Sequence, residues 1–291
     1  MPLPYSRIAL TARSDFEKKE EMLNDIAEIV IESGASLAVD AERCDCPSLK
    51  KYERYANLRG FDLIIVVGGD GTILRTVKEM EEFSAVLLTV NTGTIGFLSE
   101  LSADECLAEI PKFLAGTGHV EEREMLACTV MRNGKEIISE HALNEIVVSQ
   151  GAIARLIQLK TTINDVPFTT FRADGIIIST PTGSTAYNLA AGGPILHPSS
   201  AEIIITPINP HTLTQKPLGI PSRSHITVEV LHRESSHEDV RISLTIDGQT
   251  HHEIARGDRV EITTHKERIR FLRREHDSFY ETLREKLGWG E

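Results

Sequence analysis

The sequence predicts two domains, an α/β domain built on a parallel sheet and a mainly β domain that follows it. Two observations predict this organisation. Up to about residue 120, short apolar runs alternate with segments of helical periodicity, and beyond it apolar and polar residues mostly alternate one by one. The 291 residues, 41% hydrophobic and 25% charged, are enough for two cores. We therefore expect an α/β domain over residues 1–122 and a β-rich domain over residues 123–272.

The first domain is expected to open with a strand at residues 7–12 and a helix behind it. Residues 14–17, Ser-Asp-Phe-Glu, form a capping-box pattern that starts a helix, and Gly34 would end it. The apolar stripe of this helix consists of Met22, Leu23, Ile26, Ile29 and Val30. The further elements expected are strands at residues 37–39, 63–67 and 86–90 and helices at residues 73–80 and 104–114. Because the run 63–67 is apolar throughout, its strand should be buried on both faces, as in parallel sheets.

The second domain is expected to consist of alternating strands. Asn133-Gly134 stands like a two-residue hairpin turn between strands at residues 129–131 and 137–138. Further strands are expected at residues 143–148, 156–163, 226–231, 240–246 and 260–272. Residues 278–287 are amphipathic and predict a final helix.

Composition excludes several classes of protein. A net charge of −12 opposes nonspecific nucleic-acid binding, so an anionic ligand must meet a local positive site. The four cysteines, at positions 44, 46, 106 and 128, are too irregularly spaced for a disulfide framework or a zinc site and predict free thiols. No apolar run approaches the ~20 residues of a membrane span, and the N-terminus lacks the apolar core of a secretory signal. We expect a cytoplasmic protein that binds neither membranes nor nucleic acids.

A glycine loop at residues 68–72 follows one buried strand and precedes a helix. Its glycines, Gly68, Gly69 and Gly71, allow a phosphate to approach backbone N–H groups at the positive end of the helix, beside Thr72. A carboxylate within such a loop repels phosphate unless it holds a cation or takes a proton, so Asp70 suggests chemistry. A plain strand-to-helix turn would use the same residue types.

A second loop, residues 91–98, also follows a predicted strand. It should therefore lie near the glycine loop at the carboxyl edge of the sheet, where open α/β sheets bind ligands. The same residues would equally suit an ordinary connection in which Phe97 and Leu98 belong to the core.

Hydroxyl groups are concentrated after the apolar strand that begins at Asp174-Gly175. Residues 179–185 carry five of them, and Tyr187 follows. Such groups can bind the base and sugar of a nucleoside while an aromatic ring packs beside them, although a polar surface loop has a similar composition. Asn144-Glu145, which interrupts the apolar strand expected at residues 143–148, and Asp247-Gly248-Gln249, which closes another strand with a turn, add weaker signals.

Residues 68–72 resemble the G-G-D-G-T motif shared by NAD kinases, 6-phosphofructokinases and diacylglycerol or sphingosine kinases. The ordered set of this motif, residues 91–98, Asn144-Glu145, Asp174-Gly175, residues 180–187 and Asp247-Gly248-Gln249 resembles the bacterial NAD kinase (ATP-NAD kinase) family in particular. The resemblance covers roughly residues 60–250. It implies an α/β domain, a β domain, a tail at residues 273–291 that returns to the first domain, and a homotetramer or homodimer.

The resemblance also implies an activity and its residues. The activity is transfer of the γ-phosphoryl group of ATP, with Mg²⁺, to the 2′-hydroxyl of the adenosine ribose of NAD, giving NADP and ADP. Asp70 would accept the proton, while no metal ligand is assigned by residue. The implied NAD-binding residues are Asp70, Gly71, Arg75, Asn144, Glu145, Arg155, Arg172, Asp174, Thr185, Ala186, Tyr187, Asn188, Leu189, Ala190 and Gln249.

Several alternatives remain open at the level of the sequence. Asp70 could act as an indirect ligand of Mg²⁺ instead of a base. A lipid or sugar kinase could use the same glycine loop, but a lipid kinase would be expected to show a wide apolar mouth or a basic patch. A noncatalytic dinucleotide sensor would gain nothing evident from a carboxylate beside phosphates, which makes Asp70 the discriminating residue.

Overall fold

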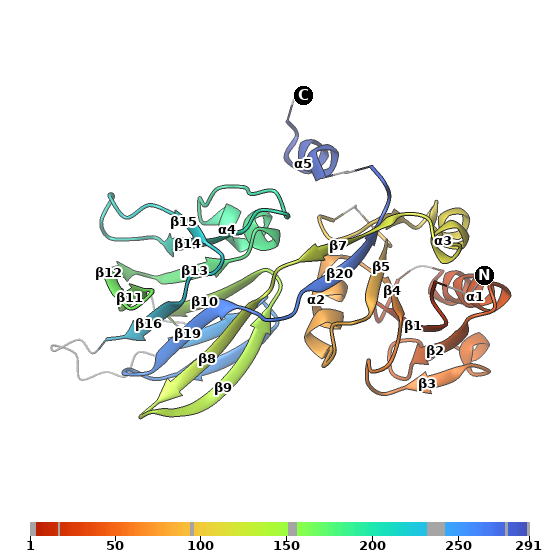
Figure 1. Cartoon of the computed structure of the whole chain (residues 1–291), viewed down its shortest axis with the longest axis horizontal. Helices are drawn as coiled ribbons and strands as arrows, with labels where there is room; N and C mark the ends of the chain where they lie inside the picture. The colour runs from red at the N-terminus through yellow and green to blue at the C-terminus, as the bar shows by residue number, and fades with distance from the viewer. Residues whose placement is uncertain are drawn as a thin grey trace. The chain divides into compact units, whose positions relative to one another are not determined.

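The computed structural model of the chain describes residues 4–16, 18–93, 96–150, 156–231, 242–276 and 279–289, and the chain divides into two units (Figure 1). The first unit combines Met1–Glu122 with Ile269–Glu291, and the second consists of Arg123–Arg268. Residues 269–272, which we expected in the β-rich domain, thus belong to the first unit. No helix in the described part of the chain is long and apolar enough to cross a membrane.

The first unit is an α/β layer whose sheet has the order β3-β2-β1-β4-β5-β20-β7, with β6 beside β5. Its strands are β1 (Arg7–Ala12), β2 (Ser36–Asp40), β3 (Glu53–Tyr55), β4 (Leu63–Val67), β5 (Val86–Asn91), β6 (Leu101–Ser102), β7 (His119–Arg123) and β20 (Ile269–Arg273). The pairings among β1 to β6 and of β20 with β5 are parallel, which confirms the expected parallel sheet. All five residues of β4 are buried, as predicted from their apolar run.

Helices cover both faces of this sheet. The first face carries α1 (Lys19–Glu32) and α3 (Cys106–Leu114), whose apolar residues form one core with alternate residues of β1, β2, β4 and β5. The next residue along each strand points to the opposite face, where α2 (Asp70–Glu79) packs on β4 (Figure 1). The short 3-10 helix η1 (Pro47–Leu49) and α5 (Phe279–Leu287) complete the unit.

The start of α1 differs from the capping-box prediction. The helix begins at Lys19, and Lys18 before it adopts a left-handed conformation (φ 55°) with no side-chain cap. Ser14 stays outside the helix, and its carbonyl oxygen instead accepts a hydrogen bond from Nζ of Lys19 (2.7 Å). Glu17, the last residue of the predicted box, lies outside the described residues.

The second unit consists of two six-stranded antiparallel sheets that share one core. One sheet has the order β15-β14-β13-β10-β17-β18 and the other β12-β11-β16-β19-β8-β9. The strands of the first are β10 (Glu145–Gln150), β13 (Gly175–Ser179), β14 (Glu202–Ile208), β15 (Leu218–Pro221), β17 (Ile242–Ile246) and β18 (Thr250–Ile254). Those of the second are β8 (Leu126–Arg132), β9 (Lys135–Ala142), β11 (Ile157–Ile163), β12 (Val166–Ala173), β16 (Ile226–Val230) and β19 (Arg259–Thr264).

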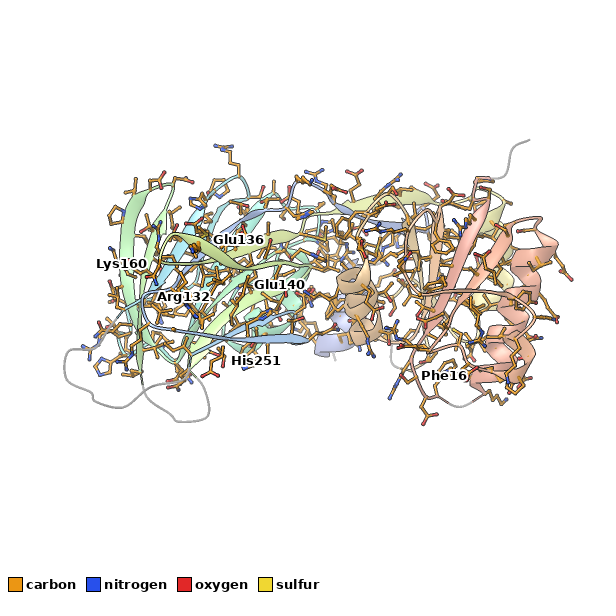
Figure 2. The ribbon with its side chains drawn as sticks, turned by 90° about the horizontal axis from the view of Figure 1, so that it is seen from below. Phe16, Arg132, Glu136, Glu140, Lys160 and His251 are labelled. Atoms are coloured by element: carbon orange, nitrogen blue, oxygen red, sulfur yellow. The ribbon has the colours of Figure 1, made fainter. Side chains whose placement is uncertain are left out.

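Tight turns and polar contacts hold these strands in register. Asn133 and Gly134 both have positive φ (51° and 76°), which confirms the predicted two-residue turn between β8 and β9. Arg132, which lies at the end of β8 and is labelled in Figure 2, forms a two-pronged ion pair with buried Asp258 (2.8 and 2.7 Å). Oε1 of Glu140 on β9 lies 2.8 Å from Nε2 of His252 on β18, which joins the edges of the two sheets.

The alternating stretch at residues 260–272, expected as one strand, is two strands in different sheets. β19 ends at Thr264, while β20 pairs with β5 through Arg270 and Phe271. Phe271 is fully buried, which stabilises this docking by about 1.5–3 kcal/mol. Alternation identifies a strand but not the sheet that it joins.

Candidate functional site

The glycine loop forms the connection from β4 to α2. Gly68 donates its N–H to the carbonyl of Val90 (2.8 Å), which ties the loop to β5. A Cβ on Gly68 would lie 2.4 Å from Oγ1 of Thr72, so the backbone can pass there only without a side chain. Gly69 is the N-cap of α2 and provides no side-chain cap. The helix therefore presents its positive end without a side chain of its own in front of it.

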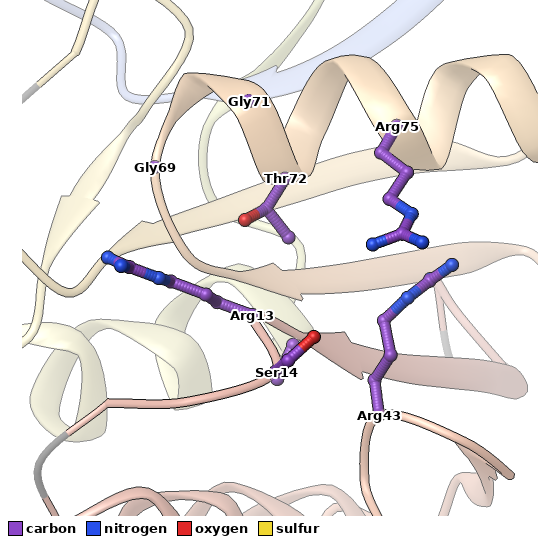
Figure 3. A pocket seen from close by; sticks show the side chains of 8 residues that line it. Arg13, Ser14, Arg43, Gly69, Gly71, Thr72 and Arg75 are labelled. Atoms are coloured by element: carbon purple, nitrogen blue, oxygen red, sulfur yellow. The ribbon is translucent and has the colours of Figure 1, made fainter. Parts of the chain in front are cut away.

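A pocket of about 310 Å³ opens beside this helix end (Figure 3). Its lining consists of Ala12 at the end of β1, Arg13 and Ser14 after it, Arg43 after β2, and Gly69, Gly71, Thr72 and Arg75 from the glycine loop and α2. The strand order reverses between β1 and β4, and open α/β sheets bind ligands at such a reversal, beyond the carboxyl ends of the strands. Three guanidinium groups and a helix N-terminus make this pocket a site for a multiply charged anion, in a chain whose net charge is −12.

Two of the three arginines are held by acidic residues. Nη1 of Arg43 donates to Oδ2 of buried Asp40 (2.9 Å), and its Nη2 bonds Glu79. Glu79 also pairs with Nε of Arg75 (3.5 Å). Arg13 is exposed, and no hydrogen bond or ion pair of its guanidinium is found among the described residues. Arg43 is thus prearranged, while Arg13 keeps its donors for a ligand.

The second loop holds the carboxylate of Asp70. The N–H of Phe97 donates to Oδ2 of Asp70 (3.0 Å) and the N–H of Leu98 donates to Oδ1 (3.2 Å). A Cβ on Gly96 would lie 1.9 Å from Oδ1, so the carboxylate occupies the space that glycine leaves. The predicted proximity of the two loops is confirmed by these contacts. Thr94 and Ile95 of this loop lie outside the described residues.

In the second unit, Asp247 organises the start of β10. Its carboxylate accepts the N–H groups of Leu143 (2.8 Å), Asn144 (2.7 Å) and Glu145 (2.9 Å). Thr180 joins the same cluster, because its Oγ1 donates to the carbonyl of Leu143 (2.6 Å) and its N–H donates to the carbonyl of Asn144 (2.9 Å). The hydroxyl-rich segment and the Asn144-Glu145 strand edge therefore form one site.

This cluster contains buried polar atoms without a partner among the described residues. They are Oδ1 of Asn144, Oε2 of Glu145 and Oγ1 of Thr182. Burial raises the pKa of Glu145 to about 8, the charge of Asp247 adds to the shift, and a hydrogen bond from the N–H of Tyr187 opposes it. Buried polar groups in folded proteins are nearly always satisfied, so three such atoms in one cluster indicate a polar ligand.

Residues 185–190, the last part of the hydroxyl-rich segment, are of two kinds. Some have exposed surface that a ligand can contact, and one is buried and supports the loop. Tyr187 is 45% exposed at the start of α4 (Tyr187–Ala190), just after the 3-10 helix η2 (Thr182–Thr185). Thr185, Ala186 and Leu189 are half-buried and Ala190 is exposed. Asn188, expected to contact the ligand, is fully buried, and its side chain bonds the carbonyls of Ser184 and Pro194 and the hydroxyl of Thr206. Its side chain supports the loop from within.

The structure does not bring every expected residue to this cluster. Arg172 and Asp174 precede β13, whereas Thr180 and Thr182 follow it, so even Asp174 and Thr180 lie about 20 Å apart along the strand. Asp174 accepts a hydrogen bond from Nδ2 of Asn209 (3.0 Å). Gln249 is exposed beside Gly248, and Arg155 lies outside the described residues.

Sequence reasoning missed Arg13, Ser14 and Arg43. Arg13 directly follows the strand expected at residues 7–12, and Arg43 follows the strand expected at residues 37–39. Their place at the carboxyl edge of a parallel sheet was therefore a usable signal.

The described residues contain no group of three or more histidine, cysteine, aspartate or glutamate side chains that could hold a metal ion. The thiols of Cys44, Cys46, Cys106 and Cys128 are buried and none of them forms a disulfide, as predicted.

Fold and site together define an α/β protein with a three-arginine pocket at a strand-order reversal and a polar cluster in a second, β-rich unit. Residues 15–118 match the family model of the ATP-NAD kinase N-terminal domain, and residues 143–274 match that of the ATP-NAD kinase C-terminal domain. The chain therefore belongs to the NAD kinase family, a family of phosphotransferases.

Similar proteins agree with this membership. The NAD kinase of Geobacter sp. (strain M21) is 43% identical over 230 residues, which cover 79% of this chain and 78% of that protein. The NAD kinase of Sulfurimonas denitrificans is 35% identical over 280 residues, covering 96% and 93%. Among solved structures, yeast NADH kinase complexed with NADH shares the fold with a TM-score of 0.87 at 23% identity, covering 99% of this chain and 89% of that one. An Archaeoglobus fulgidus NAD kinase in complex with ATP has a TM-score of 0.74 at 24% identity, covering 97% and 98%.

Proposed function

We propose that this protein transfers the γ-phosphoryl group of ATP to the 2′-hydroxyl of the adenosine ribose of NAD, giving NADP and ADP. The observation that carries the proposal is the three-arginine pocket at the N-terminus of α2, next to a carboxylate that two backbone amides hold in place. Family membership and the names of the relatives, NAD kinases and an NADH kinase, support both substrates.

The triphosphate is assigned to the arginine pocket. Phosphoryl transfer needs neutralised phosphate charge and an aligned nucleophile more than covalent help. Arg43, fixed by Asp40 and Glu79, provides a preset positive charge, while Arg13 and Arg75 approach from two other elements. The N–H groups of the glycine loop complete the binding of the anion.

A divalent cation such as Mg²⁺ is proposed to accompany the triphosphate. Mg²⁺ usually keeps several waters and is bound largely through substrate phosphates, so Asp70, which is kept for the acceptor hydroxyl, would reach the cation only indirectly, through one of these waters. The cation would neutralise phosphate charge during the transfer. A protein-built cage of several acidic residues is not required for such a role.

Asp70 is assigned to the acceptor hydroxyl. Its carboxylate would orient the 2′-hydroxyl and take its proton as the bond to phosphorus forms. Because a carboxylate is a weak base for a sugar hydroxyl, the proton passes late, and positioning plus acceptance contribute about 10²–10⁴-fold to the rate. The amides of Phe97 and Leu98 hold this carboxylate in one orientation beforehand.

The polar cluster of the second unit is assigned to the dinucleotide. The unpartnered atoms of Asn144, Glu145 and Thr182 match the hydroxyl and amide groups of a nucleoside, and the exposed ring of Tyr187 can pack beside its base. Such a polar acceptor site distinguishes the protein from lipid kinases, to which we propose a superfamily relation through the glycine loop.

Assembly is proposed to complete the dinucleotide site. Arg172 and Asp174 lie one strand length from Asn144 within a single unit, so residues from two copies meeting in a homodimer or homotetramer could line one site. We further propose a cytoplasmic location, with membranes and nucleic acids playing no part.

The direct test is to incubate the pure protein with ATP, Mg²⁺ and NAD and to measure NADP with an NADP-specific dehydrogenase. We expect NADP to form in proportion to enzyme and time, and to be absent without ATP. If no NADP forms while ATP is consumed with another acceptor, the acceptor assignment is wrong.

A further inference from the structure

Residues 97–100, the segment that holds Asp70, are themselves fixed by further hydrogen bonds. After Phe97 and Leu98 have donated their N–H groups to Asp70, the carbonyl of Leu98 accepts a hydrogen bond from Oγ1 of Thr89 (2.9 Å). The N–H of Glu100 donates to the carbonyl of Thr89 (3.2 Å). One side of the segment is thereby tied to β5.

The other side of the segment is tied to Arg273, the last residue of β20. Nη1 of Arg273 donates to the carbonyl of Ser99 (3.2 Å) and to Oε2 of Glu100 (3.1 Å), while its Nε donates to Oε2 of Glu121 on β7 (2.9 Å). The side chains of Arg273 and Glu100 are only 10% and 5% exposed, so water screens this contact little. Arg273 thus bonds the carbonyl one residue beyond the amide that binds Asp70.

Three further contacts, made by two residues, connect the same region of the chain to this segment. The neighbouring Arg274 donates its N–H to Oε1 of Glu100 (3.1 Å) and its Nη2 to the carbonyl of Glu100 (2.9 Å). The ring of Phe279, at the start of α5, lies 6.4 Å from the ring of Phe97. Arg273, Arg274 and Phe279 therefore contact the segment at Phe97, Ser99 and Glu100.

We propose that Arg273 is a positioning residue for Asp70, acting through residues 97–100. The inference rests on the proposed role of Asp70. A guanidinium is needed because its planar fork bonds a carbonyl and two carboxylates at fixed angles, which the single ammonium of lysine cannot reproduce. Loss of the fork lets the amides of Phe97 and Leu98 shift, and a displacement of the order of 1 Å at a reacting group can cost about 10²-fold in rate.

The test compares R273K with R132K. The control changes the same residue type opposite another buried carboxylate, because Arg132 pairs with Asp258, which is 1% exposed, in the second unit. We expect R273K to lower kcat by about 10-fold or more, with the KM values for ATP and NAD changed less than about 3-fold. R132K should keep the wild-type kcat.

A double variant separates positioning from a general structural effect. If Arg273 acts through Asp70, adding R273K to D70N should lower kcat no further than D70N alone, because the group being positioned is already lost. A second loss of the same size as in the wild-type background would overturn the proposal, and so would a wild-type kcat in R273K.

Hydrogen exchange provides a readout that does not depend on activity. In R273K the amides of Phe97 and Leu98 should exchange faster than in the wild type, whereas in R132K they should not. Unchanged protection of these two amides in R273K would overturn the proposal. If D70N keeps full turnover, or the wild type forms no NADP, the proposed function fails, while the exchange result still decides whether Arg273 fixes this segment.

Discussion

Asp70 combines a position in the first turn of α2 with two backbone amide contacts to its carboxylate. Asp70→Asn keeps the size of the side chain but removes the proton acceptor. We expect kcat to fall by at least ~10²-fold while NAD still binds, as measured by steady-state kinetics and isothermal titration. Near-normal turnover would eliminate Asp70 as the proton acceptor.

Gly96 leaves the space that the carboxylate of Asp70 occupies. A Cβ there would meet Oδ1 at 1.9 Å, whereas a Cβ on Gly219, on β15, would meet no atom within 4 Å. Gly96→Ala should therefore displace Asp70 and lower kcat by about 10–10²-fold. Gly219→Ala is the matched control and should leave kcat unchanged. Equal kinetics in the two variants would show that Asp70 tolerates displacement.

Glu145 links the stability of the protein to pH. Burial, with a contribution from Asp247, raises its pKa from 4.5 to about 8. Between these values the folded state retains a proton that the unfolded state releases, so this contribution to the free energy of unfolding is complete below pH 4.5 and is lost as the pH rises to about 8. Because glutamine does not ionise, the Glu145→Gln variant should not lose this stability as the pH rises.

The measurement is the melting temperature of the wild type and of Glu145→Gln between pH 5 and pH 9. We expect the variant to be the more stable protein above pH 8, by about 2–4 °C for each kcal/mol that the ionised carboxylate costs. Parallel pH curves for the two proteins would contradict a proton on Glu145.

At the scale of elements, the ends of β1, β2 and α2 bring three arginines to one pocket. Arg13 is the one whose removal breaks no contact found among the described residues. Arg13→Ala should therefore raise the KM for ATP about 10-fold, roughly 1.4 kcal/mol, without lowering the melting temperature. Exposed Arg223, in the second unit, provides the control substitution Arg223→Ala, which should change neither value. An unchanged KM in Arg13→Ala would remove this arginine from the triphosphate site.

The sequence predicted those strands and turns that depend only on the residues within them. The buried strand at residues 63–67 and the Asn133-Gly134 turn are confirmed, because an apolar run and paired positive φ values are properties of the residues themselves. β14 was not predicted, and it contains Pro207, a residue that is unusual within a paired strand.

The candidate site was predicted only in part, for a similar reason. The glycine loop was visible as a motif in the sequence. The pocket, however, depends on the strand order that brings Arg13 and Arg43 together, and no local pattern reveals that order.

At the scale of the whole molecule, the proposed shared site makes activity depend on assembly. Light scattering across a dilution series, run beside the NADP assay, should show turnover falling as the oligomer dissociates. A fully active monomer at all concentrations would remove both the oligomer and the shared site, while leaving the phosphotransferase assignment intact.

Mixed oligomers provide a sharper form of this test. Asp70→Asn and Asp174→Ala subunits, each weakly active alone, are mixed after dissociation and allowed to reassemble. If the two residues act in one site across a two-fold interface, up to about a quarter of wild-type turnover should return. Turnover no higher than the average of the two separate variants would place Asp70 and Asp174 in the same subunit's site.

The second unit is inserted between β7 and β20, so the sheet of the first unit takes a strand from beyond residue 268. During synthesis, domains generally fold as units while the chain emerges. The second unit can fold as soon as residue 268 has left the ribosome, whereas the first must wait for β20 although most of it was made earlier. A released chain that is truncated after residue 268 should therefore resist protease in its second half and remain open to cleavage in its first.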